Sequence, residues 1–344
     1  MLDRRQAIIG AAALTALPAF AQHKLLSGAE WDKVVADARK EGEVSFYSSG
    51  VARAEEPLMK GFEAATGIKV KYARPGGAEV IIRKIQTEIG AGRPLADVAS
   101  MTDKALGIWA EKENLTAPMP VPNVANIDPA YPVDSLSNLP TGGFGLVIAY
   151  NTKMMTPATA PKSYADLADP RYKDMVLIGA PENAGSTTVM IKGWVQHYGW
   201  DFVEKLRKNG LAETRLQAEA AQAVARGEKP ICVVAQAWAF VNMKQNAPIA
   251  VIWPSDGVVF AEMSLIRMRN SPNPNAALVF ANYLLTAEYQ SGSQAIAGAY
   301  GSVKGAAVPD LLPPVASLKR MPVNLAELVA QRGEITDRWR KIMS

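Results

Sequence analysis

Residues 41–80 read EGEVSFYSSGVARAEEPLMKGFEAATGIKVKYARPGGAEV, and this stretch decides the fold. A short β-prone run at 44–47 is broken by two serines and a glycine, and a single apolar stripe at 58–65 then predicts a helix. Gly67 follows as a C-cap, and residues 68–72 alternate apolar with polar side chains, which is typical of a strand. The pattern predicts a strand, a crossover helix and a second strand.

Two strands joined by a crossover helix form a parallel pair, and ligands of such sheets bind beyond the carboxyl ends of the strands. The loops at that edge lead to helix N-termini, whose free N–H groups favour anions. These loops contribute the first predicted ligand-binding residues: Ser48, Ser49, Arg74, Gly76 and Gly77. The alternative is that the serines only cap a helix and the glycines only form a turn.

The same order of strand, polar turn and helix follows at the next predicted strand, residues 95–99. Ser100 and Thr102 come directly after it and join the predicted crevice, although Thr102 would also serve as a plain N-cap. Residues 116–140 are rich in proline and asparagine, which predicts a surface meander with one short helix at most.

A second glycine–hydroxyl turn lies between a predicted strand at 175–179 and a helix that runs to about His197. Backbone N–H groups and hydroxyls in such a loop hold an anion without a cation. The turn adds four predicted ligand-binding residues: Gly185, Ser186, Thr187 and Thr188. An N-cap with hydroxyl neighbours explains the same pattern equally well.

A helix is predicted over residues 212–227 and a strand over 230–235. Gln236 and Trp238 begin the next helix and are expected at the crevice edge of the same sheet. Trp238 would cover an apolar or ring-shaped part of the ligand, or pack within the protein.

Two long β runs, residues 142–151 and 258–267, are predicted to cross between two domains. The second run holds Glu262. A carboxylate in the cleft would favour a ligand that carries an amine as well as an anionic group.

The N-terminus is predicted to be a signal peptide, residues 1–21. Arg4 and Arg5 precede an apolar run of 11 residues at 7–17, and an Ala-x-Ala signal follows at 19–21. The run is too short to span a bilayer, which takes about 20 residues. Cleavage after Ala21 and a periplasmic location are expected.

Composition restricts the function classes. The net charge of +4 is too small to indicate a nucleic-acid partner. Cys232 is the only cysteine, and it lies in an apolar run that predicts a core position. Imidazole could come only from His23 and His197, and no Ser-His-Asp, HExxH or Walker pattern is present. We therefore expect no resident metal, no cofactor and no enzyme activity.

Four motifs match a known family in order and spacing. They are FEAATGIKV at 62–70, GAGRPLADV at 90–98, AVARGE at 223–228, and SPNPNAA at 271–277 with YLLTAEYQ at 283–290. On these residues the chain resembles the extracellular solute-binding proteins of bacterial ABC importers, in the large group that includes the ferric-iron-binding proteins.

The resemblance implies an α/β fold of two lobes, a periplasmic binding protein in which each lobe is a mainly parallel sheet flanked by helices. Two crossing strands join the lobes, and a small-molecule ligand binds between them by hinge closure. The first lobe would be residues 41–145 plus 262–344, and the second 146–261. The implied partner is an inner-membrane ABC permease, and a monomer is expected.

The ferric members of that group hold iron with adjacent tyrosines in the helix after the Arg-Gly-Glu strand. Here the corresponding residues are 236–240, QAWAF, without tyrosine. The resemblance therefore argues against iron, and the remaining hydroxyls, N–H groups and Arg74 predict a small organic anion, such as a phosphonate, phosphate ester or carboxylate. Two alternatives remain: Fe(III) bound through a synergistic anion, and an exported enzyme on a related fold.

Overall fold

The computed structural model describes residues 24–183 and 185–344. The predicted signal peptide and its cleavage position after Ala21 lie outside the described residues.

Residues 41–80 fold as predicted, into two parallel strands joined by a helix. The elements of this part of the chain are α1 (Gly28–Glu41), β1 (Glu43–Ser48), α2 (Ala52–Thr66), β2 (Lys69–Ala73), α3 (Ala78–Gly90), β3 (Val98–Met101), α4 (Lys104–Lys112) and β4 (Thr116–Ala117). Gly67 ends α2 with φ 76°, a left-handed conformation that glycine adopts without steric cost. Strand β3 also lies parallel to β1, so three strands end at the same edge.

Residues 116–140 are not the surface meander that their composition predicts. They contain the short helix η2 (Pro122–Asn126), and Met119, Val121 and Tyr131 are almost fully buried. These side chains belong to the same core cluster as Phe46 of β1. Proline and asparagine determine the local turns here, but the apolar residues between them pack against the first half of the sheet.

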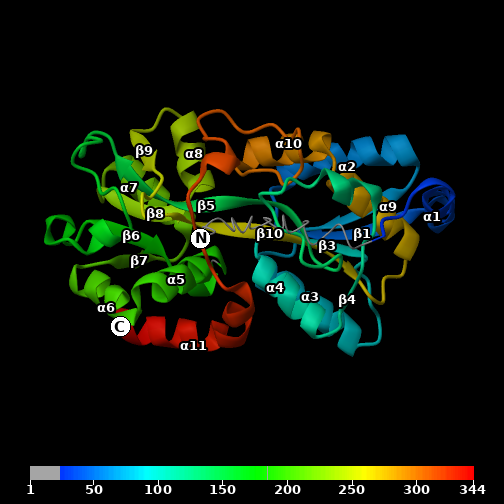
Figure 1. Ribbon diagram of the computed structural model, residues 1–344, viewed down its shortest axis with the longest axis horizontal. Coiled ribbons are helices and arrows are strands. Elements are labelled where there is room, and N and C mark those ends of the chain that lie inside the picture. Colours follow the sequence, from blue (N-terminus) through cyan, green and yellow to red (C-terminus); the bar gives the residue numbers. More distant parts are fainter. Residues whose placement is uncertain (1–23, 184) are drawn as a thin grey trace, which may run out of the picture.

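Two long strands connect the halves of the molecule, as predicted. They are β5 (Leu139–Asn151) and β10 (Val258–Met268), and they pair with each other antiparallel (Figure 1). Strand β10 also pairs antiparallel with β3 on one side, and β5 also pairs antiparallel with β8 (Ile231–Ala235) on the other. Every residue of β5 is buried. The result is one curled sheet that runs through both halves.

The second half is again a parallel arrangement, with β6 between β8 and β7. Its further elements are η3 (Ala165–Ala168), η4 (Pro170–Tyr172), β6 (Val176–Gly179), η5 (Pro181–Asn183), α5 (Gly185–Tyr198), α6 (Trp200–Lys208), β7 (Ala212–Thr214), α7 (Gln217–Arg226), α8 (Gln236–Lys244) and β9 (Ile249–Ile252). The helix predicted over 212–227 is too long, because its first residues pair with β6 as strand β7.

The C-terminal part returns to the first half and then crosses back. Its elements are α9 (Pro274–Leu284), α10 (Ala287–Ala297), η6 (Val315–Ser317), β11 (Arg320–Met321) and α11 (Leu325–Met343). Leu328, Ile335 and Trp339 of α11 pack in the core cluster of the second half, with Trp194 of α5. The predicted domain limits stay a prediction, but this last helix contacts the second lobe.

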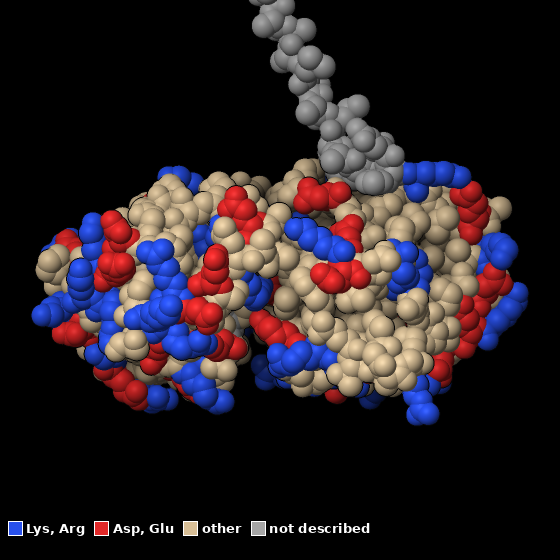
Figure 2. Space-filling model, turned by 90° about the horizontal axis from the view of Figure 1, so that it is seen from below, with Lys and Arg blue, Asp and Glu red and all other residues tan. Residues whose placement is uncertain are grey.

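Figure 1 shows helices on both sides of the crossing strands. Helices α2, α8 and α10 lie on one side, and α3, α4, α5 and α11 lie on the other. Figure 2 shows Lys and Arg interspersed with Asp and Glu over the face that it presents, rather than gathered by sign. Within the described residues, no helix has the length and apolar character needed to cross a membrane.

Candidate functional site

A cavity of about 630 Å³ lies where the carboxyl ends of the strands from both halves face each other. The N-terminal ends of six helices contribute to its wall. These are Ala52 of α2, Ala78 of α3, Asp103 before α4, Gly185 of α5, Gln217 of α7 and Ala237 of α8. The arrangement follows from the strand–turn–helix order of the chain, which places each helix start beyond the end of a strand.

Several of these helices begin without a side chain that caps them. The N-cap residues Val51 of α2, Gly77 of α3 and Ala235 of α8 make no side-chain capping bond, whereas Asp103 accepts from the N–H groups of Ala105 and Leu106 in α4. The first N–H groups of a helix need an acceptor and carry partial positive charge. The cavity wall is therefore suited to oxygen atoms of an anionic ligand.

Many of the predicted ligand-binding residues line this cavity. They are Ser49, Arg74, Gly77, Ser100, Thr102, Gly185, Ser186 and Trp238. Arg74 is exposed, and its Nε donates a hydrogen bond of 2.6 Å to the carbonyl oxygen of Gly50, which also lines the cavity. The guanidinium is thereby held at the first polar loop.

The other predicted residues do not line the cavity. Several of them form hydrogen bonds within the protein instead. Ser48 is fully buried, and its Oγ donates to Glu55 Oε1 at 2.9 Å. Thr187 accepts from Gln217 Nε2 at 2.8 Å, and Thr188 is turned towards the carbonyl of Pro181. Both threonines belong to the buried part of α5, whereas Gly185 and Ser186 before them are half-buried.

Gln236 and Gly76 also serve the fold rather than the cavity wall. Gln236 is fully buried, and its Nε2 donates to the carbonyl oxygen of Gly298 at 2.9 Å. Gly76 has φ 152° and lies against Val80, where an added Cβ would come within 3.0 Å of a methyl carbon. Its position requires glycine for the turn into α3.

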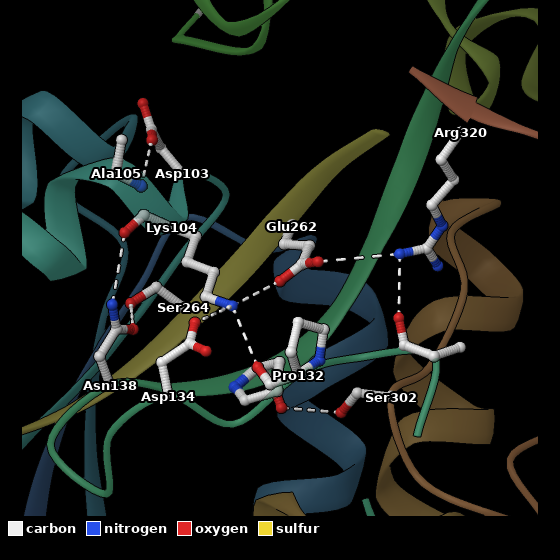
Figure 3. Close-up of polar contacts among 12 residues, drawn as sticks. Asp103, Lys104, Ala105, Pro132, Asp134, Asn138, Glu262, Ser264, Ser302 and Arg320 are labelled. Carbon is white, nitrogen blue, oxygen red and sulfur yellow. Dashed lines mark hydrogen bonds and ion pairs between the residues drawn. The ribbon is translucent and has the colours of Figure 1, made fainter. Parts of the chain in front are cut away.

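Glu262 does not line the cavity, and its carboxylate belongs to a network of ion pairs with Lys104 and Arg320 (Figure 3). Its Oε2 is 2.7 Å from Lys104 Nζ, and its Oε1 is 3.8 Å from Arg320 Nη1. The next residue, Met263, lines the cavity instead. Successive side chains of a strand point to opposite faces, so the expectation that Glu262 contributes a carboxylate to the cleft is wrong.

A buried carboxyl that the sequence interpretation missed does line the cavity. Glu55 of α2 is 5% exposed and accepts from Ser48, from Tyr72 at 3.0 Å and from Tyr289 at 3.3 Å. Burial raises the pKa of Glu55 above its usual value, although the three hydroxyl donors and the charge of Arg74 act in the opposite direction. Only the tertiary structure brings Tyr289 of α10 to this carboxyl.

At one edge of the cavity, Arg332 of α11 holds two carboxylates of the first half. Its Nη2 forms a close ion pair with Asp103, and its Nη1 is 3.4 Å from Glu79 Oε1. Gly185 lies against the same carboxylates: an added Cβ would be 2.7 Å from Asp103 Oδ2. Asp103 directly follows Thr102 but was not among the predicted ligand-binding residues.

The remaining wall is largely apolar. Phe144 of β5, Met263 of β10, Trp238 of α8 and Ile296 of α10 line it. Gln217 contributes an amide: its Nε2 donates to Ser186 Oγ at 3.1 Å, and its Oε1 accepts from the N–H of Ala235 at 2.9 Å. This amide fixes the hydroxyl of Ser186 at the start of α5.

Comparison with known proteins identifies the family. The family model for bacterial extracellular solute-binding proteins matches residues 93–323 of the 344. The chain belongs to this family. The resemblance seen in the sequence motifs is thereby confirmed, and with it the class of periplasmic solute-binding proteins that serve ABC transport systems.

Relatives of this solute-binding protein differ in what their names say they bind. A periplasmic protein of Salmonella typhimurium, whose name proposes 2-aminoethylphosphonate binding, is 27% identical over 202 residues, which are 57% of this chain and 56% of that relative. The aligned part is thus little more than half of that relative. A spermidine/putrescine-binding periplasmic protein of the same organism is 24% identical over 77% of this chain and 79% of its own length.

Solved structures confirm the two-lobed fold of this solute-binding protein. Iron-bound HitA from Pseudomonas aeruginosa has a TM-score of 0.77 at 20% identity, over 87% of this chain and 99% of its own. AfuA from Actinobacillus pleuropneumoniae, with fructose-6-phosphate bound, has a TM-score of 0.76 at 21% identity, over 88% of this chain and 98% of its own. At these identities the likeness concerns the fold alone.

Proposed function

We propose that this protein is the periplasmic substrate-binding component of an ABC importer and that it captures a small organic anion in the cavity between its lobes. The ligand class is a phosphonate, phosphate ester or carboxylate, with or without an amine. The observation that carries the proposal is the set of uncapped helix N-termini, those of α2, α3 and α8, that meet at one cavity.

The polar side chains of the wall support an anion further. Ser49, Ser100, Thr102 and Ser186 are each partly exposed at the cavity, so their hydroxyls are accessible to a ligand. Arg74 lies beside the first of these loops and suits bidentate contact with a phosphonate or carboxylate group. Glu79 and Asp103 share the single positive charge of Arg332, so their two negative charges are compensated in part at the edge of the cavity.

The proposal also includes the steps of transport. The ligand is released unchanged, the lobes close over it by bending at β5 and β10, and an inner-membrane permease recognises the closed form. The protein acts as a monomer without nucleic acid. Export is accompanied by cleavage of the signal peptide after Ala21, which N-terminal sequencing of protein from the periplasm would test by finding Gln22 as the first residue.

A thermal-shift screen of the mature protein tests the ligand class. The compounds are methylphosphonate, 2-aminoethylphosphonate, a sugar phosphate, acetate, amino acids, spermidine, and Fe(III) with and without bicarbonate. A ligand at a hundredfold excess over its Kd stabilises the folded state by about 2.7 kcal/mol. We expect the shift with an anionic compound. A shift with spermidine alone, or with Fe(III) alone, would contradict the proposal.

The variant Ser186→Ala then tests the position of the anion. Loss of one charge-assisted hydrogen bond costs about 1.5–3 kcal/mol, so affinity for the anion found in the screen should fall at least tenfold. The control is Ser27→Ala, which removes an exposed serine hydroxyl that makes no capping bond at the start of α1. Equal affinities of both variants would remove the start of α5 from the site.

A further inference from the structure

Large apolar side chains are concentrated on one part of the cavity wall. On the side where α11 lies (Figure 1), the starts of α4 and α5 contribute Asp103, Gly185 and Ser186 to the wall. On the opposite side, Trp238 of α8 and Ile296 of α10 line the cavity, and each is 44% exposed. Exposure of large apolar side chains to water is energetically unfavourable. Their presence on a cavity wall therefore needs an explanation.

The two helices that carry these side chains are held together across the lobes. Gln236 Nε2 of α8 donates to the carbonyl oxygen of Gly298, just after α10, at 2.9 Å. An added Cβ on Gly298 would be 2.6 Å from the ring of Phe240. This close approach makes α8 and the end of α10 one continuous wall. Phe144 and Met263 of the crossing strands line the same cavity.

The volume of the cavity fits more than a small anionic group. About 630 Å³ lies in the range of pockets that bury drug-sized organic molecules, roughly 300–1,000 Å³. A phosphonate or carboxylate group alone would leave the apolar wall in contact with water. An apolar body attached to the anion would bury this wall and displace that water.

Two buried residues with hydroxyl groups also lie along this wall. Thr141 is 4% exposed and Ser293 is 5% exposed, and both line the cavity. Neither hydroxyl oxygen has a hydrogen-bond partner within the described part of the chain. Buried hydroxyls are normally paired, so these two unpaired groups are unusual features beside the apolar wall.

We propose that the ligand is an organic anion with a ring-sized apolar body, whose body lies against Trp238 and Ile296 while its anionic group lies at the N-termini of α2, α3 and α5. The proposal rests on the proposed function, because it takes the anion site from there. It adds a separate subsite in α8 and α10, which distinguishes ligands by their apolar part.

Matched probes separate the two parts of the site. Isothermal titration calorimetry of the mature protein compares phenylphosphonate with methylphosphonate, and benzylamine with methylamine. Burying a ring against the apolar wall should make phenylphosphonate bind at least about tenfold more tightly than methylphosphonate. In Trp238→Ala this advantage should fall to less than about threefold. The control is Leu95→Ala, which removes an exposed apolar side chain outside the cavity and should keep the full advantage.

Tryptophan fluorescence gives a second measurement that does not depend on affinity. Phenylphosphonate should change the emission of the wild-type protein and leave that of folded Trp238→Phe nearly unchanged. Equal binding of both phosphonates would overturn the apolar subsite and leave the anion site intact. Binding of both ring compounds, with neither methyl compound bound, would support the subsite and contradict the anion site. Failure of both ring compounds to bind would overturn the subsite.

Discussion

Glu262 and Lys104 form an ion pair that is largely shielded from solvent. Their side chains are 12% and 6% exposed, and their charged atoms are 2.7 Å apart. Lys104 Nζ also donates to the carbonyl oxygen of Pro132 at 3.2 Å, and Asp134 lies 3.9 Å away. The pair lies on the far side of the strand from the cavity, so its role is structural.

Glu262→Gln should destabilise the protein by about 3 kcal/mol, because removal of one partner leaves a buried ammonium without its nearest counter-charge. Urea-induced unfolding measures the loss. The matched control is Glu30→Gln, which breaks a pair with Lys24 whose side chains are 51% and 80% exposed. Such exposed pairs contribute about 0–1 kcal/mol. Equal losses in the two variants would show that Lys104 is compensated without Glu262.

The raised pKa of Glu55 makes stability depend on pH. A carboxyl with a raised pKa binds its proton more tightly when folded, so the stabilisation is complete below the unfolded value of about 4.5 and is lost as pH rises through the folded pKa. Glu55→Gln lacks this titration. Its free energy of unfolding, relative to wild type, should therefore increase from pH 4 towards neutral pH in urea titrations. If the free energies of unfolding of the two proteins changed in parallel with pH, the raised pKa of Glu55 would be refuted.

Helix α5 begins at a close approach between the lobes. The start of the helix has no Cβ at Gly185, and the carboxylates of Asp103 and Glu79 occupy the adjacent space. Asp103 is held in place twice, by the N–H groups of α4 and by Arg332. Glycine at the first position of α5 therefore allows this helix to approach the first lobe.

Gly185→Ala should weaken ligand binding several-fold, because its Cβ would be 2.7 Å from Asp103 Oδ2 and 3.0 Å from Glu79 Oε1 in the present arrangement. The lobes would have to separate at this edge. Calorimetric titration with the anion from the screen measures the effect. The control is Gly90→Ala at the end of α3, where an added Cβ meets nothing within 4 Å. Unchanged affinity in Gly185→Ala would show that Asp103 yields without lobe movement.

Helix α11 couples the two lobes of the whole molecule. It is anchored on the second lobe, where Trp339 is fully buried and its Nε1 donates to Glu213 at 2.7 Å. From the same helix, Arg332 reaches Glu79 and Asp103 of the first lobe. The helix therefore bridges the cleft opposite α8 and α10, and it limits how far the lobes separate.

Arg332→Ala should increase the radius of gyration of the ligand-free protein in small-angle X-ray scattering, because the carboxylates of the first lobe lose their partner on α11. Arg338→Ala is the matched control: it removes a guanidinium from the same helix, and that group lies over Trp200 of the second lobe alone among the described contacts. A radius equal to that of the control would show that the crossing strands alone set the opening.

Much of the fold was predictable from local patterns. The 3.6-residue and two-residue periodicities of 41–80 correctly predicted α2, β1 and β2, and the glycine–hydroxyl turns marked loops that reach the cavity. The direction in which a single side chain points was harder to predict from the sequence. Strand β10 is buried on both faces, so its sequence lacks the polar alternation that would have placed Glu262 opposite Met263.

Local patterns in the sequence predicted the strand–turn–helix units of both halves, because these units depend on short-range periodicity and on the handedness of crossover connections. The family rested instead on a resemblance of four motifs, which the family model confirms. The tertiary structure decided which of the polar residues at that edge face the cavity. It also brought Tyr289, Ile296 and Arg332 to a site formed by loops far away in the sequence. Contacts between distant segments depend on how whole elements pack, and no local pattern encodes that packing.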